Sequence, residues 1–210
     1  MITKNPNFLI ILSAPSGGGK STILQEVLRV RDNIDYSVSY TTRKPRGAEE
    51  NGTHYHFVDE PEFLSRRQSG DFLETAQVFG RWYGTSISYI QSRLQAGRHV
   101  IMDIDVQGAA QIGATTIPYV KIFIIPPSMD VLRDRLVKRA TDSPEEIHKR
   151  LDIARDELQY IPAYDYLVVN DRLGVAVQDV LAIIRAEENR VSRYWEPIAG
   201  FLNQERNNDQ

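Results

Sequence analysis

The sequence contains no cysteine. This excludes disulfide bonds, thiolate metal sites and a cysteine nucleophile, and it leaves no link to an oxidising compartment. Long hydrophobic runs are also missing, because the longest early apolar run, residues 8–12, is far below the roughly 18 residues of a membrane span. We therefore expect a soluble, cytoplasmic protein without a targeting segment or a membrane partner.

An excess of charge of one sign is absent as well. Lys and Arg total 25 and Asp and Glu total 28, so the formal net charge is −3. That balance is too near neutrality for a general nucleic-acid coat, and we expect no nucleic-acid partner. Internal repeats and low-complexity segments are also lacking, which disfavours solenoids and propellers. The 210 residues suffice for one hydrophobic core.

The apolar runs alternate with helical patterns. Buried strands are predicted at residues 8–12, 99–105, 120–125 and 166–169. Helices are predicted after Lys20, after Ser128, and after Ser143, where Pro144 and Glu146 complete a capping box. A last amphipathic pattern covers residues 175–184. The alternation predicts an α/β fold with a parallel sheet flanked by helices.

Residues 35–92 break this rhythm. Strand-like pieces are predicted at 36–40, 54–58 and 72–78, with one helix at 60–68. Turns are predicted at Gly47, Gly52, Gly80 and Gly84. The segment is therefore predicted to be a small β-rich unit inserted into the parallel fold.

Residues 14–21, A-P-S-G-G-G-K-S, fit the phosphate loop G-x-x-x-x-G-K-S/T except that Ala14 replaces the first Gly. Glycines let the backbone turn around an anion, and the N–H groups of the following helix point at phosphates. Lys20 would reach the β- and γ-phosphates and Ser21 would bind Mg²⁺. A glycine-rich turn with an unrelated lysine is the alternative. The position between a predicted strand and a predicted helix favours a nucleoside triphosphate site.

Phosphate loops occur in GTPases, motor ATPases and kinases, so the loop alone leaves the reaction open. A GTPase would carry a guanine-reading N-K-x-D segment, and the sequence has none. The run Asp105 to Gly108 does match the D-x-x-G pattern of a GTPase switch. Without the base-reading segment, the GTPase alternative is disfavoured.

A basic segment follows the start of the insertion. Arg43, Lys44 and Arg46 stand among hydroxyl residues, a composition that suits a phosphate monoester. Tyr55 and Tyr83 could add neutral donors. A solvated basic loop is the alternative. Further on, Glu74 could accept hydrogen bonds from a planar ring with adjacent N–H donors, although taken alone it is typical of an ordinary surface charge.

Several ordered segments together resemble the guanylate kinase family over roughly residues 7–190. They are S-A-P-S-G-G-G-K-S-T, S-V-S-Y-T-T-R-K-P-R-G, N-G-T-H-Y-H-F-V, D-F-L-E, Y-G-T, I-M-D-I-D-V-Q-G, P-P-S, and R-A-T-D-S with K-R-L. The resemblance implies a P-loop NTPase-type sheet, a GMP-binding insertion and a helical lid. It also implies transfer of the ATP γ-phosphoryl group to GMP, and to dGMP, giving ADP and GDP for purine metabolism and GMP recycling.

The resemblance further implies a GMP site in two parts. Guanine would be read by Ser39, Glu74 and Thr85, with Asp105 toward the base. The GMP phosphate would be held by Arg43, Arg46, Tyr55 and Tyr83. The chemistry agrees, because guanine offers N1–H and its 2-amino group side by side to a carboxylate, whereas adenine has an acceptor at N1.

For the donor, the resemblance implies an ATP site formed by Ala14, Pro15, Ser16, Gly17, Gly18, Gly19, Lys20, Ser21, Thr22 and Asn170. The expected cofactor is Mg²⁺, which Ser21 would hold directly and, as the resemblance implies, Asp103 would hold through water. The residues expected to act on the transferring phosphate are Lys20, Arg43, Arg135, Arg139 and Arg150. The helical segment that would form the lid carries four more cations, for which exposure on a pair of solvated helices is an equal alternative: Arg133, Lys138, Lys149 and Arg155.

We accordingly expect a core of residues 1–34, 93–127 and 160–194, a GMP-binding insertion at 35–92, a lid at 128–159 and a polar tail at 195–210. The chain departs from the family pattern at Thr75, where an aromatic is common, and at Ala140, where glycine is common. Two rivals share the scaffold: a ribose bisphosphate kinase, which has no guanine to read, and a non-catalytic module that binds phosphorylated peptides. The guanine-reading residues disfavour the first, and the intact Lys20 and Ser21 disfavour the second.

Overall fold

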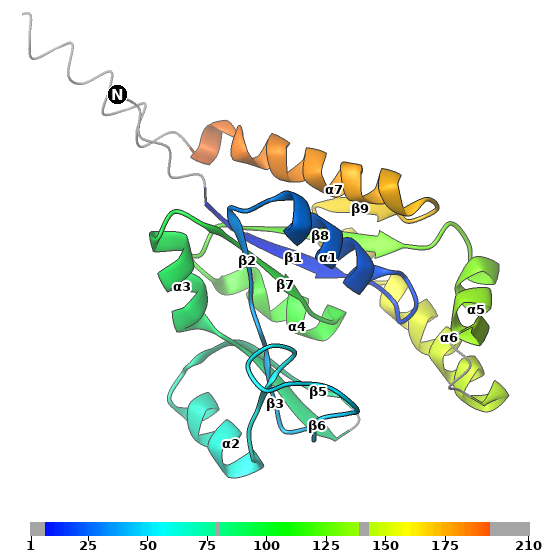
Figure 1. The fold of residues 1–210 in the computed structure, drawn as a ribbon, viewed down its shortest axis with the longest axis horizontal. Helices are drawn as coiled ribbons and strands as arrows, with labels where there is room; N and C mark the ends of the chain where they lie inside the picture. The colour runs from blue at the N-terminus through cyan, green and yellow to red at the C-terminus, as the bar shows by residue number, and fades with distance from the viewer. Residues whose placement is uncertain (1–6, 79, 139–142, 194–210) are drawn as a thin grey trace, which may run out of the picture.

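The computed structural model describes residues 7–78, 80–138 and 143–193. Within these ranges the chain forms a five-stranded parallel sheet with helices on both faces, and a separate four-stranded sheet (Figure 1). This confirms the predicted α/β class. No helix in the described part of the chain has the length and hydropathy that a membrane span requires.

The strands of the parallel sheet run in the order β2 (Ile34–Tyr36), β7 (His99–Asp103), β1 (Leu9–Ser13), β8 (Tyr119–Ile125) and β9 (Tyr166–Val169). The central strand β1 is buried along its whole length. It is apolar on both faces because helices cover both sides of a parallel sheet.

The two faces of the sheet are covered by different helices (Figure 1). Helices α1 (Lys20–Val30) and α7 (Leu173–Glu188) pack on the face to which Ile10 and Leu12 belong. Helices α3 (Ile87–Gln95) and α4 (Val106–Gln111) pack on the face of Leu9 and Ile11. This alternation along β1 holds the end of the strand, and with it the glycine loop, in a fixed position.

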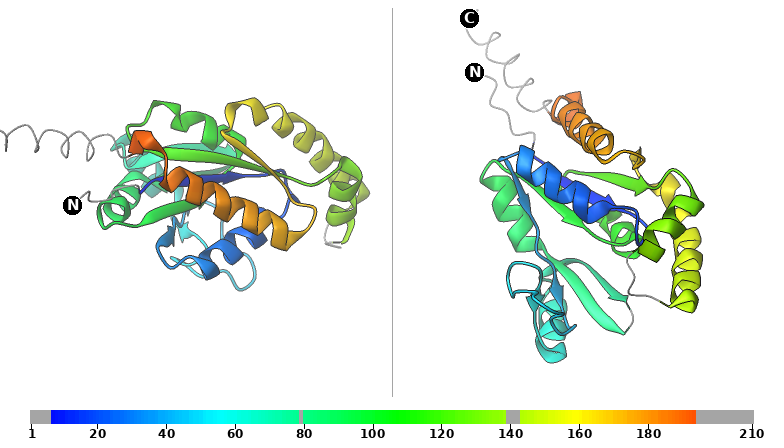
Figure 2. Two further views of the ribbon diagram at one scale, coloured as in Figure 1. Left: turned by 90° about the horizontal axis from the view of Figure 1, so that it is seen from above. Right: turned by 45° about the vertical axis from the view of Figure 1, so that its right-hand side comes forward.

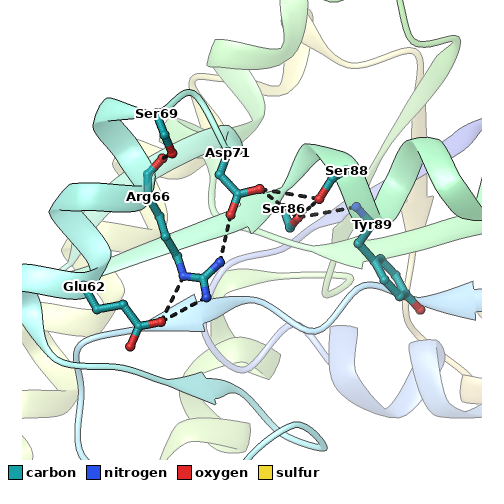
Figure 3. Close-up of polar contacts among 7 residues, drawn as sticks. All are labelled: Glu62, Arg66, Ser69, Asp71, Ser86, Ser88 and Tyr89. Carbon is teal, nitrogen blue, oxygen red and sulfur yellow. Dashed lines mark hydrogen bonds and ion pairs between the residues drawn. The ribbon is translucent and has the colours of Figure 1, made fainter.

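The four-stranded sheet runs β4 (His56–Phe57), β3 (Tyr40–Thr41), β6 (Arg81–Ser86) and β5 (Phe72–Val78). Helix α2 (Glu60–Gln68) covers it through Phe63, whose ring stacks on Phe72 and Trp82. At the junction with α3, Arg66 bridges Glu62 and Asp71, and the Ser86 hydroxyl caps the helix (Figure 3). The small sheet is thus fastened to the core at this point.

Helices α5 (Met129–Lys138) and α6 (Pro144–Leu158) form a pair with a small core of its own. These two helices lie beside the central sheet, away from the four-stranded sheet and α2 (Figure 1 and Figure 2). The predicted capping box is present, because the Ser143 hydroxyl accepts from the Glu146 amide and the Glu146 carboxylate accepts from the Ser143 amide. Three short 3₁₀ turns complete the described chain: η1 (Ile112–Ala114), η2 (Ile161–Ala163) and η3 (Val191–Arg193).

Four local predictions were wrong. The expected strand at 36–40 is two separate strands, because β2 ends at Tyr36 and pairs with β7 in the parallel sheet. Gly84 is not a turn but part of β6, where it leaves room for the rings of Phe63 and Phe72. The strand at 99–105 ends at residue 103, since Asp105 caps α4. Helix α3, which begins at residue 87, was not anticipated in the inserted segment.

Candidate active site

The glycine loop joins β1 to α1. Gly17 and Gly19 have φ angles of +93° and +92°, which residues with a side chain rarely adopt. The loop closes on itself through a hydrogen bond of 2.8 Å from the Gly18 amide to the Pro15 carbonyl. A Cβ atom at residue 19 would lie 2.2 Å from the Asn170 amide nitrogen, which itself donates to the Gly18 carbonyl. The backbone therefore needs glycine here, and Asn170 lies directly against the loop.

Lys20 begins α1 at the end of this loop. Its ammonium lies 3.6 Å from Asp103 Oδ2 and donates to the Ile104 carbonyl at 3.3 Å. The other oxygen of Asp103, Oδ1, accepts a hydrogen bond of 2.6 Å from the Tyr36 hydroxyl. Burial and the adjacent Asp103 carboxylate raise the pKa of Tyr36, so the phenol keeps its proton. Lys20, Asp103 and Tyr36 thus form one connected polar group beside the loop.

Glu74 lies on β5 with only 4% of its surface exposed. Its Oε1 accepts from the Thr85 hydroxyl at 2.7 Å, and the Ser39 hydroxyl lies 3.4 Å from that of Thr85. Burial raises the pKa of Glu74 to about 7, the Thr85 hydrogen bond opposes this rise, and Asp105 adds to it. The second oxygen, Oε2, is so near the backbone of α4 that a Cβ at Gly108 would lie 2.7 Å from it.

The D-x-x-G run has a structural explanation in this arrangement. The Asp105 carboxylate caps α4 by accepting from the Gly108 amide at 2.8 Å. Gly108 is small because Glu74 packs against it. The pattern that resembled a GTPase switch is therefore a helix cap beside a buried carboxylate.

Arg43 is held rigidly near the small sheet. Its guanidinium makes two parallel hydrogen bonds of 2.8 and 2.9 Å to the Glu49 carboxylate and lies over the Tyr55 ring. Glu49 also accepts from the Arg46 amide at 2.8 Å. The hydrogen bonds from Arg43 keep the pKa of Glu49 low, at about 2, so that carboxylate is ionised. The Tyr83 ring stands edge-on to Tyr55, 5.9 Å away between centroids.

Three adjoining pockets bring the predicted residues together. A cavity of about 240 Å³ is lined by Lys20, Ser39, Tyr55, Glu74, Tyr83, Asp103 and Asp105. Lys20 and Asp105 also line a second, polar pocket with Ala14, Pro15, Ser16, Gly17, Gly19, Ser21 and Thr22. Tyr83 also lines a third pocket with Arg43 and Arg46. A continuous surface thus leads from the glycine loop to Glu74 and to the arginine pair.

Helices α5 and α6 reach the glycine loop at several points. Leu132 and Leu136 of α5 lie against Gly17, where an added Cβ would meet each at 3.1 Å. Arg135 donates to the Asn170 carbonyl at 2.8 Å, and its Nη1 is buried with no hydrogen-bond partner among the described residues. Arg150 of α6 donates to the Ser16 hydroxyl at 3.1 Å. The predicted Arg139 and the departure Ala140 lie outside the described residues.

Three residues of this region were not predicted from the sequence: Tyr36, Glu49 and Glu157. Glu157, in the last turn of α6, lines the loop pocket, and burial raises its pKa to about 7 with Asp105 adding to the rise and Lys20 opposing it. Its Oε2 is buried without a partner among the described residues. Glu49 could have been suspected from the sequence, because it stands in the basic loop. Tyr36 and Glu157 are brought to the site only by tertiary packing.

The residues available for a metal ion are oxygen donors. Ser21 lines the loop pocket and the Asp103 carboxylate lies beside Lys20. The described residues contain no group of three or more His, Cys, Asp or Glu side chains that could hold a metal ion. This donor set fits Mg²⁺, which is usually held by one or two protein oxygens, by waters and by the phosphates of the substrate.

A glycine loop at the end of a central parallel strand, with a second pocket built around a buried carboxylate, defines a P-loop nucleotide-binding protein of the kinase type. A family model described as guanylate kinase matches residues 7–187. A guanylate kinase of Methylobacillus flagellatus is 45% identical over 198 residues, which cover 92% of this chain and 98% of the relative. The chain belongs to the guanylate kinase family.

Further relatives agree. A guanylate kinase of Legionella pneumophila (strain Paris) is 42% identical over 202 residues, 96% of this chain and 97% of the relative. The crystal structure of guanylate kinase from Anaplasma phagocytophilum is similar with a TM-score of 0.75 and 33% identity, and the match covers 92% of each chain. The predicted family and fold are thus confirmed.

Proposed function

We propose that this protein transfers the γ-phosphoryl group of ATP to GMP, and to dGMP, giving ADP and GDP. The observation that supports this best is the continuous surface between the glycine loop and the buried pair Glu74 and Thr85. It offers a triphosphate site and a base site on either side of one lysine, as a phosphoryl transfer between two nucleotides requires.

At the donor end, the loop amides and Lys20 would hold the ATP phosphates, and Asn170 would line the base end of the site. Ser21 would bind Mg²⁺ directly and Asp103 would hold it through water. When bound, the ion would neutralise charge on the donor phosphates. Arg135 supports this assignment, because it binds the Asn170 carbonyl beside the loop and its Nη1 has no hydrogen-bond partner among the described residues.

At the acceptor end, Glu74 would accept from guanine N1–H and the 2-amino group, with Ser39, Thr85 and Asp105 around the same ring. Adenine would place an acceptor against the carboxylate and leave its charge unpaired. The GMP phosphate would lie between Arg43, Arg46, Tyr55 and Tyr83. This arrangement favours GMP over AMP.

The transfer needs no general base. The acceptor phosphate has a second pKa near 6 and is mostly dianionic at neutral pH. Lys20, Arg43, Arg135, Arg139 and Arg150 would neutralise the developing charge. We further propose that 35–92 acts as the GMP-binding insertion and 128–159 as a lid on the core of 1–34, 93–127 and 160–194, and that their closure excludes water.

The proposal is tested by measuring ADP release from ATP and Mg²⁺ with GMP, AMP, CMP, UMP and ribose 1,5-bisphosphate offered separately. We expect turnover with GMP that is lost in Glu74→Ala, while ATP binding in that variant, measured by calorimetry, is unchanged. Turnover confined to the ribose bisphosphate would move the acceptor chemistry to the rival kinase. Failure to bind ATP would instead revive the non-catalytic binding module.

The donor end has its own test in Lys20→Met. We expect kcat to fall by at least about 10²-fold, because a preorganised charge on the transferring group is removed from a water-poor site. GMP affinity, measured by calorimetry without ATP, is expected to stay close to that of the wild type. Near-normal turnover in a folded Lys20→Met protein would contradict the assignment.

A further inference from the structure

Asp103 lines the acceptor cavity and lies beside Lys20, the residue that follows the glycine loop. Its Oδ2 lies 3.6 Å from the Lys20 ammonium, which is longer than a direct charged hydrogen bond. Its Oδ1 is engaged by the Tyr36 hydroxyl at 2.6 Å, a short, charge-assisted contact. The two oxygens of one carboxylate are therefore divided between a neutral donor and a cation.

Tyr36 is well placed to hold this carboxylate still. It ends β2, and its backbone is paired with Ile101 of β7, the strand that ends at Asp103. Its own carbonyl accepts from the Tyr89 hydroxyl at 3.1 Å, and its ring packs partly buried against the core. The backbone of Tyr36 is thus held by two contacts and its ring is packed, so the hydroxyl is presented to Asp103 from a fixed position.

The direction matters because an aspartate side chain turns easily about its last bond. If Oδ1 were released, the carboxylate could rotate and close the 3.6 Å gap to Lys20. A tight ion pair would hold Lys20 and Asp103 on each other rather than on a bound nucleotide. The Tyr36 hydroxyl opposes that rotation by satisfying Oδ1.

We propose that Tyr36 is a positioning residue that orients Asp103, so that Oδ2 faces the magnesium-bound phosphates of the donor while Lys20 stays available. The inference rests on the proposed function, and deepens it by adding a residue outside the nucleotide pockets. A purely structural role is the competing explanation, since the Tyr36 ring also packs against the core.

The test is calorimetric binding of ATP to the full-length protein, with saturating Mg²⁺ and with EDTA. Tyr36→Phe keeps the ring and removes the hydroxyl. We expect it to weaken ATP binding with Mg²⁺ about tenfold, the usual scale for losing a residue that orients a metal-site carboxylate. ATP binding in EDTA, GMP binding and the thermal midpoint are expected to stay at wild-type values. Tyr166→Phe, which loses a hydroxyl bonded to Glu187, is the matched control and should change none of these.

A double-mutant cycle with Asp103→Asn completes the design. Because Tyr36 acts through Asp103, Tyr36→Phe should cause no further loss in the Asp103→Asn background. If Tyr36→Phe lowers the thermal midpoint, the same comparison still separates the two explanations, because a purely structural loss of ATP binding would persist in the Asp103→Asn background. A loss that is equal in EDTA, a loss that persists in the Asp103→Asn background, or no loss at all would overturn the inference. Absence of Mg²⁺-dependent ATP binding by the wild type would instead overturn the proposed donor site.

Discussion

At the scale of single residues, Glu74 is a carboxylate buried in the cavity where we propose that the acceptor base binds. Its pKa is about 7 in the folded protein and 4.5 for an ordinary Glu. Between these values the folded protein binds a proton that the unfolded chain has released, so the unfolding free energy falls as pH rises through this window. Above neutral pH the buried Glu74 carboxylate is ionised, and there it lowers the unfolding free energy of the unliganded protein most.

This predicts the behaviour of Glu74→Gln, which has no charge at any pH. Relative to the wild type, we expect the variant to gain unfolding free energy on the order of 2 kcal/mol between about pH 5 and about pH 8. Urea unfolding of both proteins at the two pH values measures the difference. A difference that does not change with pH would show that Glu74 titrates normally.

Glu49 is a second residue whose substitution should alter the proposed GMP site. Its carboxylate orients the Arg43 guanidinium and accepts from the Arg46 amide. Glu49→Gln cannot accept both parallel hydrogen bonds from Arg43. We expect the KM for GMP to rise about tenfold, as for the loss of a charged hydrogen bond, with the KM for ATP unchanged. Steady-state kinetics of Glu49→Gln and of the neighbouring control Glu50→Gln test this. Equal effects in both variants would contradict it.

At the scale of elements, helix α6 depends on a local capping box rather than on a large core. Only Leu151 and Ala154 of this helix are buried, whereas α7 buries six residues. The helix therefore opens more easily than the core helices, and its stability is sensitive to its cap.

Ser143→Ala removes the oxygen that accepts from the Glu146 amide. We expect α6 to lose about 1 kcal/mol of local stability. Amide hydrogen exchange should become several-fold faster in the first turns of α6 and remain unchanged in α1 and α7. Faster exchange in all three helices would mean that α6 opens only with the whole molecule.

At the scale of the whole molecule, a buried polar cluster joins distant parts of the core. His99 at the start of β7 accepts from the Phe8 amide at 3.3 Å through Nδ1, so its Nε2–H donates to Glu188 of α7 at 3.2 Å. Arg31, just after α1, also binds Glu188. Burial lowers the pKa of His99, although Glu188 opposes this effect. The folded protein therefore keeps His99 neutral below the usual pKa of 6.5.

Below about pH 6.5 the unfolded chain binds a proton at this position that the folded protein does not, so unfolding free energy is lost as pH falls. We expect His99→Gln to be less stable than the wild type at neutral pH, and the gap to narrow toward about pH 5. His148→Gln, at an exposed histidine of α6, is the control and should show no such narrowing. Urea unfolding across this pH range is the measurement, and a gap of constant size would contradict the prediction.

Features that depend on neighbouring residues could be predicted from the sequence alone. The sequence predicted the first strand at residues 8–12, and the structure has it at 9–13. The glycine loop with Lys20 and Ser21 and the Ser143 capping box were also predictable. Each of them is set by local apolar patterning, by backbone angles that need glycine, or by hydrogen bonds between residues a few positions apart. The family resemblance added the proposed residues of both nucleotide sites, and these stay predictions.

The contacts between side chains that are far apart in the sequence were revealed by the folded structure. Tyr36 and Asp103 are joined because β2 pairs with β7 in the parallel sheet, and no local pattern predicts that pairing. Glu74 has the sequence context of a surface charge, yet packing of β5 against α4 buries it. Burial and strand pairing arise from contacts distant in sequence, and these contacts set the charge, the pKa and the orientation of the groups that would act on the nucleotides.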